Sequence, residues 1–93
     1  MRIIVHCHLY LNPDAKFDEE IGKMIKASLN DKGCKSYVFV KECLQENHFM
    51  VIEEWESKEL LDEHMKQPHF VEFGNYIKTI ALKDLQIEIM EVQ

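Results

Sequence analysis

Apolar residues recur at every second position over residues 2–11, the period of a β-strand with one buried face. Residues 34–43 are rich in β-branched and aromatic types, and residues 48–55 are apolar on both faces, so both stretches are predicted strands. Only a short polar break, Gln45-Glu46-Asn47, lies between them. This short connection favours an antiparallel hairpin.

Two regions between the strands show the longer period of helices. The first helix is predicted to start at Asn12-Pro13, because Asn is a good N-cap and Pro fits the first turn. It is predicted to end at Lys32-Gly33, with the glycine as a left-handed cap. The second region is capped by Ser57 and interrupted at Pro68, and a further helical stretch begins near His69.

A fourth strand is predicted from the alternation of Leu85, Ile87 and Ile89 with polar residues. After Met90 the alternation slips, which indicates a bulge or a strand that leaves its own sheet. The resulting order, β-α-β-β-α-β, predicts a ferredoxin-like α+β fold with a four-stranded antiparallel sheet and helices on one face. A chain of 93 residues forms one domain, expected over residues 2–92.

The sheet face without helices carries His8, Tyr10 and apolar residues of the hairpin, which would stay in water in a monomer. We therefore expect a homodimer joined through this open sheet face, as a dimeric α/β barrel. The alternative is a monomer with a polar open face.

Composition narrows the range of functions. Seventeen acidic residues against eleven Lys and Arg give a net charge of −6, which argues against nucleic acid and anionic membrane surfaces as partners. No apolar run approaches the length of a membrane helix, and the start of the chain lacks the features of a signal peptide, so we expect a cytoplasmic protein.

Three cysteines without a CxxC spacing do not predict disulfides or a zinc site. The glycines are too far apart for a nucleotide or flavin loop, so we expect no cofactor.

His6 and His8 form an HxH pair on one strand face, a spacing that can place two imidazoles on one metal. Hydrogen bonding at a dimer interface explains the pair with fewer assumptions, so we expect no metal site. Glu53 and Glu54 are adjacent, and adjacent strand residues face opposite ways. The two carboxylates are therefore not expected to act as one acid/base pair.

The block Glu53-Glu54-Trp55-Glu56-Ser57, the inward His64 and the run Pro68-His69-Phe70 resemble the antibiotic biosynthesis monooxygenase (ABM) domain family. More narrowly, they resemble its small quinol-monooxygenase-like members. Gly33-Cys34 before the second strand also looks like the family's pattern. The resemblance extends over essentially the whole chain, and it is specific for the domain but not for a substrate.

The resemblance implies a dimeric α+β barrel and cofactor-independent oxygenation of a small aromatic, phenolic or quinol-like substrate with O₂. Haem-degrading relatives need an Asn, a Trp and an axial His at positions that here look like Cys7, His64 and Gly74, so haem degradation is not expected. Two alternatives stay open: a non-catalytic module that binds a quinone or phenol, and an oxygen-independent isomerase of a small carbonyl compound.

His64 is the candidate proton acceptor, because an imidazole near neutral pKa can take a phenolic proton. A purely structural His64 would instead tie its helix to a strand carbonyl or to a nearby Glu. His69 and Tyr37 are candidates to polarise a substrate oxygen, although a capping role explains His69 as well, and a place at the dimer interface fits Tyr37 equally. The residues expected to line a substrate pocket are Cys7, Trp55, Phe70 and Phe73; each also fits a purely structural place in the core.

Overall fold

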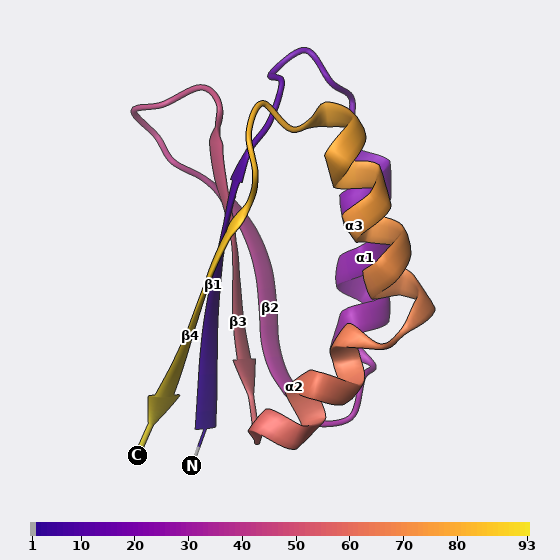
Figure 1. The fold of residues 1–93 in the computed structure, drawn as a ribbon, viewed down its shortest axis with the longest axis vertical. Helices are drawn as coiled ribbons and strands as arrows, with labels where there is room; N and C mark the ends of the chain where they lie inside the picture. The colour runs from indigo at the N-terminus through magenta and orange to yellow at the C-terminus, as the bar shows by residue number, and fades with distance from the viewer. Residues whose placement is uncertain (1) are drawn as a thin grey trace.

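The computed structural model describes residues 2–93 and forms, within that range, four strands and three helices. Their order is β-α-β-β-α-α-β (Figure 1). The elements are β1 (Arg2–Tyr10), α1 (Asp18–Leu29), β2 (Cys34–Lys41), β3 (His48–Trp55), α2 (Lys58–Met65), α3 (Pro68–Ile80) and β4 (Gln86–Val92).

The sheet has the strand order β2-β3-β1-β4, and every neighbouring pair is antiparallel. All three helices lie on one side of it, and α1 packs beside α3 (Figure 1). This arrangement confirms the predicted ferredoxin-like α+β fold and the hairpin between β2 and β3. Pro68 occupies the first turn of α3, where its missing N–H is not needed, and so it separates α2 from α3.

The core lies between the sheet and the helices, and strand periodicity decides which side chains enter it. On β1, Ile3, Val5 and Leu9 are buried as predicted. On β3, burial alternates without interruption, and Phe49, Val51, Glu53 and Trp55 all face the helices. A carboxylate therefore stands in a row of otherwise apolar core positions. No helix in residues 2–93 combines the length and apolar character needed to cross a membrane.

The predicted start of the first helix is wrong by five residues, since the N-cap is Phe17 and not Asn12. Helix α1 begins at Asp18, and the side chain of Asn12 instead accepts a hydrogen bond from the Asp14 amide at 3.0 Å, forming a local turn. The Asn12 amide donates to the carbonyl of Ile80 at 2.9 Å, which joins this turn to the end of α3. Asn12 is thus engaged in the turn and cannot act as the N-cap.

Two further expectations differ from the structure: the glycine cap at the end of the first helix and the irregularity in the last strand. Helix α1 ends at Leu29, so Gly33 lies beyond the helix, although its φ of +88° has the predicted left-handed sign. Strand β4 stays paired with β1 through Val92 and shows no bulge. The register shift lies instead in β2, between Cys34 and Ser36.

Candidate functional site

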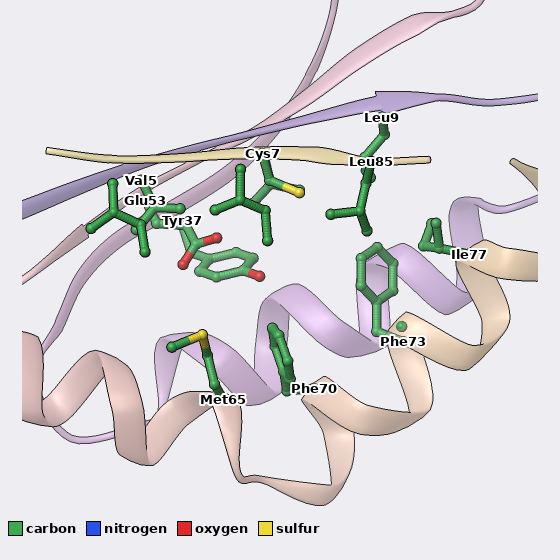
Figure 2. Close-up of a pocket in the computed structure, with 14 residues that line it drawn as sticks. Val5, Cys7, Leu9, Tyr37, Glu53, Met65, Phe70, Phe73, Ile77 and Leu85 are labelled. Carbon is green, nitrogen blue, oxygen red and sulfur yellow. The ribbon is translucent and has the colours of Figure 1, made fainter. Parts of the chain in front are cut away.

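A cavity opens between the sheet and the α2–α3 side of the helical layer (Figure 2). Its cavity volume is about 60 Å³, and the wider space between its lining atoms, which includes open solvent, is about 570 Å³. Of the fourteen residues that line it within the described chain, only Glu53 and Tyr37 carry side-chain oxygens. The other polar contributions are the sulfurs of Cys7 and Met65, so the cavity is an apolar space with one carboxyl and one phenol.

Glu53 is the most unusual residue of this cavity. Its side chain is only 6% exposed, and the indole Nε1–H of Trp55 donates to its Oε1 at 2.8 Å. Burial raises the pKa of Glu53 to about 7, although the bond from Trp55 partly opposes the shift by favouring the charged form. A carboxyl with this pKa is divided between its two protonation states near neutrality, as a proton acceptor at working pH should be.

Tyr37 stands beside Glu53, because the two residues are register partners on β2 and β3 (Figure 2). Burial, and then the nearby Glu53 carboxylate, raise the pKa of the Tyr37 phenol well above its ordinary range. The phenol therefore stays neutral and can donate its O–H to a bound oxygen. Burial and Glu53 likewise raise the pKa of Cys7 to about 12, so this thiol is not an activated nucleophile.

Behind the cavity wall, Asp31 bridges two histidines. Its Oδ2 lies 2.6 Å from Nδ1 of His64 and 2.7 Å from Nε2 of His69. His64 is 1% exposed, and within residues 2–93 its Nε2 has no hydrogen-bond partner. Burial lowers the pKa of His64, and the bond with Asp31 opposes that shift. The His64 ring packs against the rings of Trp55 and Phe70, with centroids 4.5 Å and 5.3 Å apart.

The structure divides the residues nominated from the sequence into two groups. Those that line the cavity are Cys7, Tyr37, Phe70 and Phe73. Those that lie outside its lining are Trp55, His64 and His69. Trp55 is fully buried and reaches the cavity only through its hydrogen bond to Glu53. The functional roles assigned to all seven stay predictions.

Sequence reasoning missed Glu53 and Asp31. From the sequence alone, Glu53 is considered only as a possible partner of Glu54. The two residues face opposite sides of the sheet, as expected, so they form no acid/base pair. The signal that could have found Glu53 is its strand phase, since it alternates with the inward Val51 and Trp55. Asp31 follows the end of α1 without any motif, and nothing in the local sequence indicates its contact with two histidines more than thirty residues away.

Comparison with known proteins identifies the family. Residues 3–76 match the family model described as antibiotic biosynthesis monooxygenase. The chain belongs to this family. An uncharacterised protein of Synechocystis sp., sll1783, is 30% identical over 93 residues, which cover 97% of this chain and 63% of that protein. The chain therefore spans a little under two thirds of this relative's length.

Solved structures share the fold over the whole chain. A conserved protein from Methanosarcina mazei superposes with a TM-score of 0.95 at 23% identity, covering 100% of this chain and 94% of that one. SnoaB from Streptomyces nogalater, described as a cofactor-independent oxygenase, superposes with a TM-score of 0.85 at 12% identity and covers 99% and 93% of the two chains. At these identities the likeness establishes the ABM fold alone.

Proposed function

We propose that this ABM protein is a cofactor-independent monooxygenase of a small aromatic substrate that carries a phenolic or quinol hydroxyl. The observation that carries the proposal is the apolar cavity whose two oxygen-bearing side chains are Glu53 and Tyr37. Membership of the ABM family and the fold shared with a cofactor-independent oxygenase support it.

Each cavity residue has a part in this scheme. Glu53 accepts the hydroxyl proton of the substrate, because its pKa of about 7 leaves a large fraction ionised at neutral pH. The neutral Tyr37 O–H donates to the oxyanion that forms. Phe70 and Phe73 supply an apolar wall that keeps water from the anion.

The substrate itself supplies the electrons. A quinol anion reacts with O₂ at a ring carbon, one oxygen atom is retained on that carbon and the other leaves as water, so a quinol and O₂ give a hydroxyquinone and water. No further reductant is needed for this balance.

Glu53 replaces His64 as the proposed proton acceptor because Glu53 lines the cavity and His64 does not. The experiment is oxygen uptake by the metal-stripped protein with a panel of naphthoquinols and polyphenols, with autoxidation subtracted and catalase and superoxide dismutase present. We expect uptake proportional to protein, and a loss of at least about 100-fold in kcat for Glu53→Gln. Glu54→Gln is the matched control, since it removes a neighbouring carboxylate from the opposite sheet face.

Three outcomes would contradict this assignment. Full activity of Glu53→Gln, with loss of activity in a folded His64→Gln, would return the base role to His64. Saturable binding of a naphthoquinone without oxygen uptake would favour a binding module. Turnover of a carbonyl substrate that is indifferent to oxygen would favour an isomerase.

We also propose that two chains associate through the open sheet face. Val38 and Val40 on this face are 46% and 39% exposed, and the ring of His48 stacks between His8 and Tyr10 there. Covering these apolar and aromatic groups would stabilise a dimer. Light scattering should give twice the chain mass of 11.1 kDa for the wild type and a lower mass for Val38→Lys. A monodisperse 11.1 kDa species at high concentration would refute the dimer.

A further inference from the structure

We propose that Asp31, His64 and His69 form a binding site for one divalent transition-metal ion of the zinc type. This Asp31–His64–His69 cluster lies beside the substrate cavity and not in it, so the site goes beyond the oxygenation proposed above.

The three side chains converge from separate segments. Asp31 lies in the turn after α1, His64 in the last turn of α2, and His69 in the first turn of α3. One ligand atom of each residue lies within 4.8 Å of the other two. Two imidazole nitrogens and one carboxylate oxygen are a donor set that Zn²⁺ takes in proteins, with the fourth position left to water.

Neighbouring aromatic rings hold the Asp31–His64–His69 cluster in place, and part of it is exposed to solvent. The His64 ring is enclosed by the rings of Trp55, Tyr37 and Phe70, which fix its orientation. The side chains of Asp31 and His69 are 15% and 22% exposed, so an ion can approach from their side. A surface depression next to His69 is lined by two carboxylate residues, Glu20 and Glu72, together with Lys23. A chain with a net charge of −6 also attracts cations over longer distances.

Binding requires a small opening of the cluster. In a tetrahedral zinc site with bonds of about 2.1 Å, neighbouring donor atoms lie about 3.4 Å apart. Here Asp31 Oδ2 is 2.6 Å and 2.7 Å from the two nitrogens, so the side chains must separate by a fraction of an ångström. Because a carboxylate only accepts hydrogen bonds, the ring nitrogens of His64 and His69 that face Asp31 both donate N–H to it, and each must also give up that proton. Metal-bound histidines usually donate their other N–H to an acceptor, and His64 Nε2 has none within residues 2–93, so we expect micromolar affinity rather than that of a closed structural site.

A second group of histidines provides the control. On the open sheet face, His8 Nδ1 lies 3.0 Å from His48 Nε2, and His8 Nε2 lies 2.8 Å from Glu88 Oε1. His8 uses its two nitrogens in different directions, so its two partners do not meet at one point. A variant at His8 therefore removes an imidazole without touching the proposed site.

The experiment titrates the EDTA-treated 93-residue chain with Co²⁺, followed by visible absorption, and with Zn²⁺, followed by calorimetry. The wild type should bind one ion with micromolar affinity. His69→Ala and Asp31→Asn should each weaken binding at least 100-fold, and His8→Gln should leave it unchanged. Circular dichroism confirms that each variant is folded, and His69→Ala keeps the His64–Asp31 contact.

A readout on the wild type does not depend on any variant. Long-range ¹H–¹⁵N spectra should show Zn²⁺ shifting one ring nitrogen each of His64 and His69 and leaving His8 and His48 in place. Absence of binding at 1 mM Zn²⁺, or binding that survives His69→Ala and disappears in His8→Gln, would overturn the proposal. In either case the cluster would be a hydrogen-bonded link between the α1–β2 turn and the two helices. Because the oxygen-uptake assay uses metal-free protein, failure of one proposal leaves the other standing.

Discussion

Glu53→Gln should stabilise the protein, and by an amount that grows with pH. The substitution keeps the shape of the side chain and an oxygen that can accept the Trp55 indole N–H. It removes the ability to ionise, and it places two amide N–H donors in the cavity at a cost that does not vary with pH. Because burial raises the pKa of Glu53 to about 7 in the folded chain, against 4.5 as its ordinary value, ionisation is easier in the unfolded chain than in the folded one.

The sign and size of the stability change follow from the difference between the pKa of Glu53 in the folded chain and in the unfolded chain. Below pH 4.5 the carboxyl is protonated in both states and contributes no penalty. As the pH rises, the unfolded state ionises first, so wild-type stability falls until the folded group has also lost its proton above pH 7. The penalty is about 1 kcal/mol at pH 5 and about 3 kcal/mol at pH 8, since each unit of pKa difference corresponds to 1.36 kcal/mol. The gain from Glu53→Gln should therefore grow by about 2 kcal/mol between these pH values.

Urea unfolding of wild type and Glu53→Gln at pH 5, 6, 7 and 8 measures this gain directly. Each free energy of unfolding is compared at the same pH, so groups common to both chains cancel. Glu54→Gln, on the opposite sheet face, controls for the loss of one negative charge; it also breaks the exposed Arg2–Glu54 ion pair, at 3.2 Å, which is worth at most about 1 kcal/mol. A Glu53→Gln gain that is flat from pH 5 to pH 8 would show that Glu53 is solvated in the folded protein, and the argument for its role as a proton acceptor would fail with it.

Two other predictions test the fold and the cavity. Gly33→Ala should destabilise the folded protein by about 1–3 kcal/mol, because φ is +88° there and an added Cβ would lie 2.8 Å from Leu60 Cβ. The control Gly22→Ala has no atom within 4 Å of its added Cβ, so it should be neutral or stabilise the protein by up to about 1 kcal/mol. Equal melting temperatures of the two variants would contradict this prediction. Native alkylation mapped by mass spectrometry should modify the exposed Cys43 first and Cys7 last, since burial raises the pKa of Cys7 to about 12; early labelling of Cys7 would contradict the buried thiol.

The fold was readable from the sequence because its signals are local. Period-two alternation predicts β1 and β4, and residue composition predicts β2 and β3. The predicted cap of α2, Ser57, is confirmed, since its Oγ accepts from the Leu60 amide at 3.2 Å. The predicted start of α1 was wrong because an Asn such as Asn12 can either cap a helix or form a turn. Its amide is bonded to Ile80, and that tertiary contact, which no local pattern reveals, favours the turn.

The site could be predicted only in part from the sequence, because it depends on which buried side chains contact one another in the folded protein. Cys7, Phe70 and Phe73 could be placed on the cavity side from periodicity alone. His64 was correctly placed on the inner side of its helix, yet the rings of Tyr37 and Phe70 pack against it and it does not line the cavity. The distance between an inward side chain and a cavity wall is a property of packing, and strand or helix phase does not determine it.

The choice of an acid at position 53 calls for a functional explanation. The buried indole N–H of Trp55 needs an acceptor, and Glu53 provides one. A glutamine would provide the same oxygen and avoid the penalty of about 3 kcal/mol that ionisation imposes at pH 8, a large part of the 5–15 kcal/mol that typically stabilises a domain, at the cost of burying two amide N–H donors. The hydrogen bond therefore accounts for a polar residue at this position but not for an ionisable one. What glutamate adds is a proton that can be taken up and released inside an apolar cavity near neutral pH, which is what deprotonation of a phenolic substrate requires.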